Sequence, residues 1–316
     1  MIRQNSFLAL AQRQKQLRKE RFLEEMEQII PWDDFCKTIE PHYEEKQTGR
    51  KKMEMIMMLK IYFLQQWFNL SDPAAEEEVY DRGSFQKFLG IDLLSQKVPD
   101  ETTILNFRHL LEAHKLQERF FAIVNEKLEA KGFLMREGTI VDATIITAPS
   151  STKNKERKRD PEMSSAKKGN QWYFGMKGHI GVDAKSGLVH SLETTAAKTS
   201  DRIPFRKLLH GKEKAVLGDK AYGKKDDKRE FRQNGIHWGI KDRASYKHPL
   251  STAQRKRNRR YGPVRAKVEH PFQVVKCQWG HAKVRYKGLF KNTMQLFSLF
   301  ALANLFRVRK MLLQQV

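Results

Sequence analysis

Residues 139–147 read TIVDATIIT, and this short stretch decides the fold of the second half of the chain. β-Branched residues fill it, which is typical of a strand. Asp142 stands in the interior of the stretch, between Val141 and Ala143. Aspartate is disfavoured inside strands, and a carboxylate there needs a partner or a task. The stretch therefore predicts a strand whose carboxylate is either paired or functional.

The residues after this strand predict a mixed α/β domain. Two further strands, at 171–182 and 188–195, flank the hairpin turn signal DAKSG at 183–187. Elements of both kinds then alternate. The pattern predicts a polar, basic connector at 150–169, a helix at 200–209, a strand at 215–218, a helix at 224–233, a strand at 236–240, a basic and turn-rich stretch at 243–260, a helix after Tyr261 and a long helix from Asn292.

The first part of the chain predicts helices joined by short turns. In residues 53–68, Ile56, Leu59, Phe63 and Trp67 share one helical face, with Gln65 opposite. Ser71 or Asp72 is a candidate cap for the next helix, and residues 99–103 open a long helix that Gly132 closes. We therefore expect an N-terminal helical arm over residues 1–50, a helical domain over 51–137 and the mixed domain over 138–316.

The positive charge of the chain is unevenly distributed. The 316 residues carry 60 Lys and Arg against 37 Asp and Glu, a net charge of +23. Residues 1–137 hold 21 basic and 23 acidic side chains, a net of −2, whereas 138–316 hold 39 and 14, a net of +25. Such asymmetry indicates a polyanionic partner, and nucleic acid is the first candidate. A merely soluble basic surface is the alternative.

Other classes are disfavoured by composition. Two cysteines, Cys36 and Cys277, do not make a secreted disulfide framework. The N-terminus has no sustained apolar run typical of a signal peptide, and the apolar stretches are too short or interrupted to span a bilayer. Only the last helix, which ends near residues 307–310, could serve at a membrane surface. We expect a soluble protein of a reducing compartment with no membrane partner.

Three acids stand out by position. Asp219 directly follows the strand at 215–218, and Glu269 is the only acid after Asp242. Carboxylates from two strands and one helix can converge to hold Mg²⁺, which prefers oxygen ligands. A pair of such ions can activate a water and stabilise the leaving oxygen of a phosphodiester. The alternatives are that Asp142 is a structural aspartate and that Glu269 makes a surface salt bridge.

The surroundings of Glu269 favour phosphate binding. Helical spacing places one face in common for Arg265, Glu269 and Lys276. A basic side chain on either side of Glu269 could then hold the phosphates that flank the scissile bond. Pro271 implies that the helix begins near Glu269 or kinks there. Elsewhere, the histidines near the acids, His179 and His270, are typical of hydrogen-bonded structural residues. The aromatic run 172–174 could stack on bases or lie in the core.

These stretches together resemble bacterial insertion-sequence transposases of the DDE type, most closely the insertion-sequence-five family. The similar segments are residues 58–77, 99–116, 138–192 and 264–292. Arg265, Glu269 and Lys276 match the family signature of Arg, three residues, Glu, six residues and Lys. In that signature a Tyr usually precedes the Arg with two residues between them, whereas three residues separate Tyr261 from Arg265. Residues 224–260 depart most from the family pattern.

The resemblance implies an RNase H-like catalytic domain that follows a helical DNA-binding region. Asp142, Asp219 and Glu269 would be the catalytic, metal-binding acids, with two Mg²⁺ ions that Mn²⁺ could replace. The enzyme would cut DNA at the terminal inverted repeats and join the 3′-OH ends to target DNA, as a homodimer in the bacterial cytoplasm, associated with the nucleoid. The helical region would bind the repeats through a few cations such as Lys51, Lys52 or Arg108. DNA contacts in the catalytic domain are expected from Arg265, Lys276, Lys153, Lys155, Lys177, Lys283, Arg285 and Lys287.

Two other functions remain open from the sequence. One is an RNase H-like nuclease that cuts nucleic acid without strand transfer. The other is a DNA-binding derivative of a transposase that no longer catalyses a reaction. Strand-transfer products from a pre-cut end would separate the first from a transposase, and an effect of Asp142→Ala on function would exclude the second.

Overall fold

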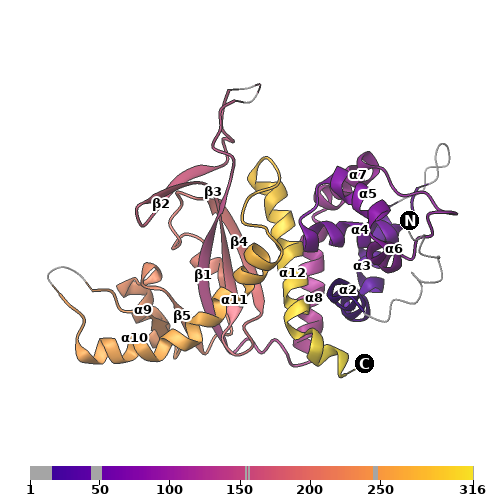
Figure 1. The fold of residues 1–316 in the computed structure, drawn as a ribbon. Coiled ribbons are helices and arrows are strands. Elements are labelled where there is room, and N and C mark those ends of the chain that lie inside the picture. Colours follow the sequence, from indigo (N-terminus) through magenta and orange to yellow (C-terminus); the bar gives the residue numbers. More distant parts are fainter. Residues whose placement is uncertain (1–15, 44–51, 154, 156, 245–247, 316) are drawn as a thin grey trace, which may run out of the picture.

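The chain forms a helical region followed by a mixed β-sheet, with the long C-terminal helix between them (Figure 1). The computed structural model describes residues 16–43, 52–153, 155, 157–244 and 248–315. The helices before the sheet are α2 (Arg18–Ile29), α3 (Trp32–Ile39), α4 (Met55–Phe68), α5 (Asp72–Asp81), α6 (Gly83–Leu89), α7 (Glu101–Ala113) and α8 (Leu116–Ala130).

Helix α4 lies at the centre of the helical region. The prediction of a helix here is confirmed, but the prediction of one buried face with Gln65 opposite is wrong, because Gln65 is only 3% exposed. Its side-chain nitrogen donates to the carboxylate of Asp72 at 2.8 Å, whereas its Oε1 is buried without a partner among the described residues. Neighbouring helices surround α4, so apolar residues occupy nearly its whole circumference.

The helix starts follow the predicted capping residues. Ser71 accepts a hydrogen bond from the Ala74 amide at 3.2 Å, and Asp100 accepts one from the Thr103 amide at 2.7 Å. The single long helix expected after residue 103 is wrong, since the chain breaks into α7 and α8. Lys115 adopts a left-handed conformation with φ 52° at the break, which interrupts the helical hydrogen bonds.

One six-stranded sheet forms the second part. Strands β3 and β1 pair antiparallel, β1 and β5 pair parallel, and β5 and β6 pair parallel, while β4 pairs with the outer side of β3. The strand order is β4-β3-β1-β5-β6, in which β4, β3 and β1 pair antiparallel and β5 and β6 run parallel to β1. This is the RNase H-like arrangement that the resemblance implied. The strands are β1 (Gly138–Thr147), β2 (Ser164–Lys168), β3 (Gln171–Asp183), β4 (Val189–Ala196), β5 (Ala215–Gly218) and β6 (His237–Ile240).

Three segments differ from the sequence prediction. Strand β2 lies in the expected connector, where it pairs antiparallel with the start of β3. Residues 200–209 form only a 3₁₀ turn, η2 (Phe205–Leu208), in place of the expected helix. The stretch expected to be rich in turns contains helix α10 (Thr252–Arg265), which begins with a capping box between Ser251 and Gln254. The helices at 224–233 and at the C-terminus are confirmed as α9 (Lys225–Gln233) and α12 (Leu289–Leu313).

Alternating side chains of the sheet enter two separate cores. Ile140 belongs to a large apolar cluster that includes α12, whereas its neighbour Val141 belongs to a smaller cluster with Phe205, Tyr222 and Trp238. Helix α12 packs against β4 on one side and against α8 and α2 on the other. The large cluster therefore extends without interruption from the sheet into the helical region.

Asp183 holds the hairpin turn between β3 and β4, as predicted. Its fully buried carboxylate accepts four backbone N–H groups, from Met135 (3.0 Å), Arg136 (2.7 Å), Lys185 (2.6 Å) and Ser186 (2.8 Å). The first two belong to the segment that leads into β1, so one side chain fastens both the turn and the entry to the central strand.

Several histidines are buried in their neutral form. Burial lowers the pKa of His190 to about 3 and the pKa values of His179 and His281 to about 4. Each makes a hydrogen bond inside the fold: His190 with the Thr139 hydroxyl, His179 with the Thr195 hydroxyl and His281 with the Gln66 carbonyl. His179 is thus a structural histidine, as the sequence indicated.

We expect the protein to lose stability in mild acid because of these histidines. Their pKa values are lower in the folded state than in the unfolded state, where an ordinary value of about 6.5 applies, so the unfolded chain binds more protons as the pH falls below about 6.5. Between pH 7.5 and pH 5, each such group should cost about 2 kcal/mol. Urea unfolding at the two pH values measures the loss. A variant His281→Gln, which keeps a donor for Gln66, should lose less than the parent chain; an equal loss would exclude His281 as a contributor.

Candidate active site

Asp142 and Asp219 lie side by side at the point where strand β5 ends. Strands β1 and β5 are parallel, and their last paired residues are Val141 and Gly218. Each aspartate is the next residue along its strand, and adjacent strands lie about 4.8 Å apart. Beyond Val141, β1 has no strand partner on that side until Thr147, which bridges to Lys283, so the edge next to the two acids is open. Two acids predicted from separate motifs are therefore neighbours.

Glu269 approaches the same place from a composite helix. α10 ends at Arg265, a 3₁₀ turn η4 (Ala266–Val268) follows, and helix α11 (Glu269–Gln273) begins at Glu269. The sequence expectation that Pro271 places a helix start near Glu269 is confirmed. The carboxylate of Glu269 is 61% exposed, whereas the side chains of Asp142 and Arg265 are mostly buried.

Arg265 joins the first and third acids. One guanidinium nitrogen lies 3.1 Å from Oδ2 of Asp142, and the other lies 3.3 Å from Oε1 of Glu269. A cationic group thus already stands between carboxylates that come from a strand and a helix. The remaining guanidinium nitrogen, Nε, is buried without a partner among the described residues.

The electrostatics of Asp142 show that both other acids act on it. Burial is the main cause that raises the pKa of Asp142, and the negative charges of Asp219 and Glu269 act in the same direction. The amide of Ala143, which donates to Oδ1 at 2.9 Å, and the guanidinium of Arg265 oppose the rise. Added positive charge would therefore stabilise the ionised form.

Lys276 reaches β1 rather than Glu269. It lies in a π-helical turn, η5 (Val274–Gln278), and its Nζ donates to Oγ1 of Thr144 at 3.1 Å and to the carbonyl of Ile145 at 2.9 Å. Burial is the main cause that lowers its pKa, and the nearby charge of Lys168 adds to the effect. Arg265 therefore contacts Asp142, and Lys276 contacts β1 two and three residues further along the strand.

The donor set suits a hard divalent cation. Carboxylate oxygens are the ligands that Mg²⁺ prefers, and the Arg265 guanidinium shows that a positive group fits between Asp142 and Glu269. Over residues 16–43, 52–153, 155, 157–244 and 248–315, however, no three His, Cys, Asp or Glu side chains are grouped closely enough to hold a metal ion together. A metal bound by all three acids would require Arg265 to leave its bridging position and Glu269 to turn inward.

Two residues near the acids were missed by the sequence analysis. The hydroxyl of Tyr222 is buried without a hydrogen-bond partner in the described part of the chain. Burial raises its pKa, and the charges of Asp201, Asp142 and Asp219 raise it further. Tyr222 stands three residues after Asp219, in the turn η3 (Lys220–Tyr222), and Asp201 stands in the segment expected to be a helix. The proximity of Tyr222 to a strand-terminal acid was the available sequence signal.

The basic residues predicted to contact DNA differ in their surroundings. Lys155, Arg285 and Lys287 line one hollow of about 380 Å³ between the 148–160 segment and the 284–287 loop. Lys153 and Lys283 are exposed. Lys177, in contrast, donates to the carbonyl of Thr199 at 2.8 Å and pairs with Asp201 at 2.7 Å. Arg285 donates to Asn69 at the end of α4, which ties the basic loop to the helical region.

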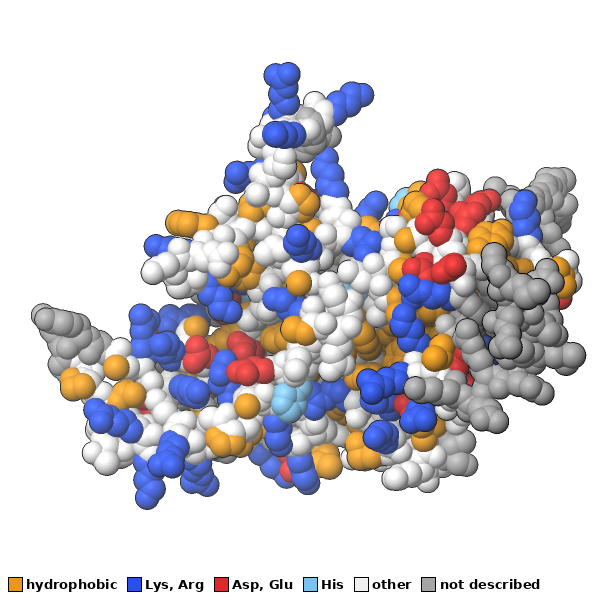
Figure 2. Space-filling model, viewed as in Figure 1, with side chains coloured by type: hydrophobic (Ala, Val, Ile, Leu, Met, Phe, Trp, Pro, Cys, Tyr) orange, Lys and Arg blue, Asp and Glu red, His pale blue; other side chains and the backbone are white. Residues whose placement is uncertain are grey.

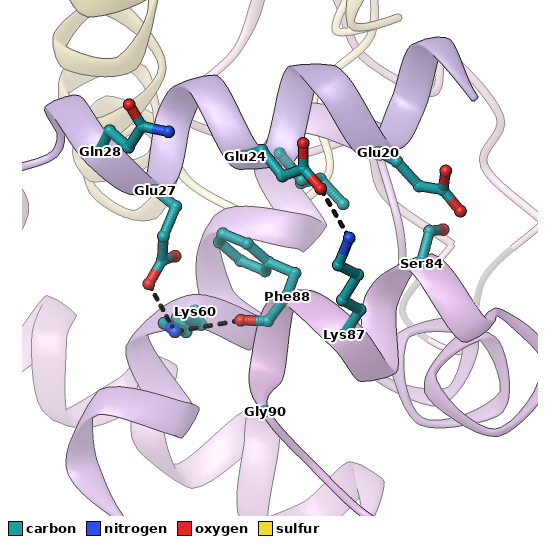
Figure 3. A pocket seen from close by; sticks show the side chains of 10 residues that line it. Glu20, Glu24, Glu27, Gln28, Lys60, Ser84, Lys87, Phe88 and Gly90 are labelled. Carbon is teal, nitrogen blue, oxygen red and sulfur yellow. Dashed lines mark hydrogen bonds and ion pairs between the residues drawn. The ribbon is translucent and has the colours of Figure 1, made fainter. Parts of the chain in front are cut away.

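The surface of the two parts differs in charge. Figure 2 shows Lys and Arg side chains spread over the sheet, the protruding 148–163 segment and α10, while acidic side chains gather over the helical region near α5 and α7. A hollow of about 250 Å³ between α2 and α6 is lined by Glu20, Glu24 and Glu27 (Figure 3). Ion pairs of Lys87 with Glu24 (2.7 Å) and of Lys60 with Glu27 (2.8 Å) stand at this hollow, so it does not suit a phosphate.

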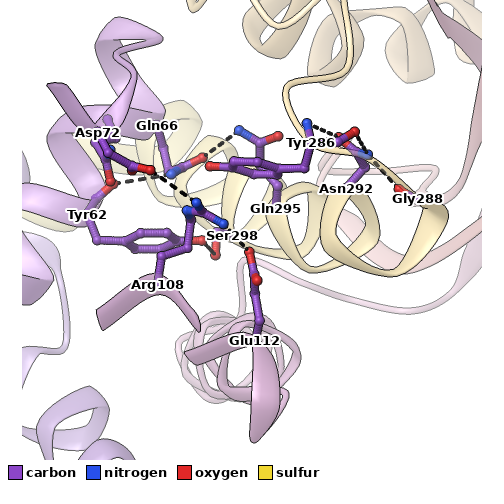
Figure 4. Close-up of polar contacts among 11 residues, drawn as sticks. Tyr62, Gln66, Asp72, Arg108, Glu112, Tyr286, Gly288, Asn292, Gln295 and Ser298 are labelled. Atoms are coloured by element: carbon purple, nitrogen blue, oxygen red, sulfur yellow. Dashed lines mark hydrogen bonds and ion pairs between the residues drawn. The ribbon is translucent and has the colours of Figure 1, made fainter. Parts of the chain in front are cut away.

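Arg108 is not available to DNA, and the expectation that it binds the terminal repeats is wrong. It is 5% exposed and pairs with Asp72 at 3.1 Å and with Glu112 at 2.8 Å, and its guanidinium lies 4.2 Å from the ring centre of Tyr286 (Figure 4). Lys51 lies outside the described residues. Lys52 stands over the ring of Tyr43 at 4.6 Å.

Among the described residues, no helix has the length and apolarity to cross a membrane. The solved structures similar to this chain include two assemblies of the Mos1 transposase. The chain is 13% identical to "Mos1 transposase paired-end complex with left transposon end", with 76% of this chain and 83% of that chain covered and a TM-score of 0.19. It is 14% identical to "Crystal structure of the Mos1 Strand Transfer Complex", with 77% and 82% covered and a TM-score of 0.20.

Two family models match the sequence itself. The model described as "Transposase domain (DUF772)" matches residues 11–110, which cover most of the helical region. The model described as "Transposase DDE domain" matches residues 134–305, more than half of the chain, and its range includes the sheet, Asp142, Asp219 and Glu269. The chain therefore belongs to the DDE transposase family.

Proposed function

We propose that the protein is an insertion-sequence transposase, most like the insertion-sequence-five family, which binds terminal inverted repeats, cuts DNA at the element ends and joins the 3′-OH ends to target DNA. The observation that carries the proposal is the adjacency of Asp142 and Asp219 at the end of β5, with Glu269 linked to Asp142 through Arg265. We infer a bacterial, nucleoid-associated enzyme that acts as a homodimer, because two ends must be held together for joining.

In this proposal Asp142, Asp219 and Glu269 hold divalent cations, Mg²⁺ or Mn²⁺. When bound, such ions would supply the activation of a water or a 3′-hydroxyl and the stabilisation of the leaving oxygen. Arg265 exchanges its contact with the two carboxylates for a contact with a DNA phosphate, which a planar guanidinium can bind with two hydrogen bonds. Lys276, fixed on Thr144 and Ile145, places a second positive charge along the same strand.

Strand transfer tests the proposed function. The purified protein is incubated with a pre-cut duplex that carries an element end and a free 3′-OH, together with a supercoiled target, in the presence of Mg²⁺ or of EDTA. We expect joined products with Mg²⁺ alone. Hydrolysis without joining would identify a nuclease, and binding without any reaction would identify a non-catalytic derivative; either result overturns the proposal.

The hollow lined by Lys155, Arg285 and Lys287 should contribute non-specific affinity for DNA. Each phosphate contact releases counterions, so its loss lowers the slope of log K against log salt by about 0.9. We expect Lys155→Ala and Lys287→Ala each to show this reduction and to weaken the binding of all duplex sequences equally. Titrations by fluorescence anisotropy at several salt concentrations measure the slope. Lys127→Ala, on the helical region, is the control, since Lys127 pairs with Asp34 at 2.7 Å; an unchanged slope in both test variants would exclude the hollow as a phosphate site.

A further inference from the structure

Trp172 is exposed in a part of the protein where aromatic side chains are otherwise packed. It stands at the start of β3, opposite Lys167 of β2, and 66% of its surface is accessible. Phe174, two residues further, packs against the large apolar cluster, with the guanidinium of Arg159 at 5.4 Å from its ring centre. The aromatic run is thus divided between a core residue and one that presents its ring to solvent.

A basic hollow lies beside the exposed ring. Its volume is about 380 Å³, and its lining includes Trp172, Lys167, Lys177, Lys198 and Asp201. Hollows of this size fall in the range that holds small aromatic ligands. An aromatic side chain beside positive charge is the combination by which proteins bind single-stranded nucleic acid, since bases stack on the ring while cations attract the backbone.

We propose that this hollow binds an unpaired DNA base, stacked on Trp172, from a strand whose phosphate lies at the carboxylate site. The proposal rests on the proposed transposase function and adds a second binding site to it. The occupant is unpaired because stacking on Trp172 requires a free base face, which neighbouring bases cover in an intact duplex.

The hollow and the acids share one structural element. Ala221, which lines the hollow, stands two residues after Asp219 in the turn η3. The next residue of the same turn, Tyr222, is buried, and burial is the main cause that raises its pKa, with the charges of Asp201, Asp142 and Asp219 adding to the effect. A strand that crosses η3 can therefore place a phosphate at the acids and a base from further along the same strand in the hollow.

Asp201 provides a fixed acceptor for the base edge. Lys177 holds its Oδ1 at 2.7 Å and is itself held by the Thr199 carbonyl, so the carboxylate cannot rotate freely. The side chain of Asp201 keeps 27% exposure, which leaves it open to an N–H group on the edge of a base. Lys177, predicted from the sequence to contact DNA, would act here by positioning Asp201.

Tryptophan fluorescence tests the site directly. Trp172 is the exposed tryptophan, because Trp67, Trp238 and Trp279 are buried and Trp32 is partly buried. A single-stranded oligonucleotide, added in EDTA, should quench the emission of the wild-type protein. An oligonucleotide of equal length with abasic positions should not, although it carries the same charge. Equal quenching by both would overturn the proposal, because it would show charge binding without stacking.

Variants of Trp172 provide the second readout. We expect Trp172→Ala to weaken single-strand binding by roughly 5- to 100-fold, with duplex binding unchanged, and Trp172→Phe to retain most of the affinity. Tyr80→Ala, at an aromatic residue on α5 that is 50% exposed, is the matched control and should bind as the wild type does. Thermal unfolding verifies that each variant is folded. An unchanged affinity in Trp172→Ala would overturn the proposal.

The base site and the transposase function can be rejected independently of each other. Because the binding assays contain no divalent metal, they report on the base site even when strand transfer is absent. Base-dependent quenching without joined products would retain the base site and reject the transposase. Joined products without base-dependent quenching would do the reverse.

Discussion

The variant Asp142→Asn should abolish DNA cleavage and strand transfer while the protein stays folded. Asparagine keeps the shape and one acceptor oxygen but removes the charge that would hold a cation. Removing a single preorganised electrostatic group slows an enzyme by roughly 10² to 10³-fold. Loss of the charge of Asp142, which stands between Asp219 and Arg265, should slow DNA cleavage at least as much. End-labelled DNA substrates in Mg²⁺ measure the loss, and circular dichroism verifies the fold.

The structure gives this prediction a specific control. Asp226 is also an acid of the catalytic domain, but its side chain is 82% exposed, and among the described residues its ion pair is with Lys224 at 3.4 Å. Asp226→Asn should therefore retain wild-type activity. Duplex binding by Asp142→Asn should also persist, because the basic residues around the site are unchanged. Residual cleavage above about a tenth of the wild-type rate would remove Asp142 from the metal-binding set that we propose.

The acids of this site could be predicted from the sequence, whereas the contacts among its side chains could not. Asp142 and Asp219 could be predicted because each interrupts or ends an apolar strand, where an acid is costly without a purpose. The position of Arg265 between two carboxylates could not, because it depends on how the α10–η4–α11 segment lies against β1. The π turn that carries Lys276 to Thr144 likewise has no local signal in the sequence.

The fold shows the same division between local and distant causes. Strand β1, the turn at Asp183 and the caps at Ser71 and Asp100 follow from residues that are close in sequence. Strand β2, with the sequence SSAKK, has little β-propensity and forms because β3 supplies a pairing edge. Helix α10 is highly basic; a capping box fixes its start, and the pairing of Arg257 with Asp242 at 2.9 Å ties its middle to the residues after β6.

Arg108 shows where a surface-charge argument fails. In a region with a net charge of −2, an arginine was a reasonable candidate for DNA contact, yet α7 directs it toward α5 and the 286–298 segment of the catalytic half. The network around it joins segments far apart in the sequence, and the Tyr62 hydroxyl lies 2.9 Å from that of Ser298 at its edge (Figure 4). Arg108 therefore stabilises the contact between the two parts of the protein.

We expect Arg108→Ala to destabilise the protein by about 3–5 kcal/mol, because it leaves the buried carboxylate of Glu112 and the partly buried carboxylate of Asp72 without their partner. Urea unfolding measures the free energy. Arg119→Ala, at an exposed arginine on α8, should change it by less than about 0.5 kcal/mol. The double variant Arg108→Met with Glu112→Leu should recover much of the loss, since it removes one buried charge together with its partner. If Arg108→Ala instead keeps full stability and loses affinity for element ends, Arg108 is a DNA contact and the network in Figure 4 is not what holds the two parts together.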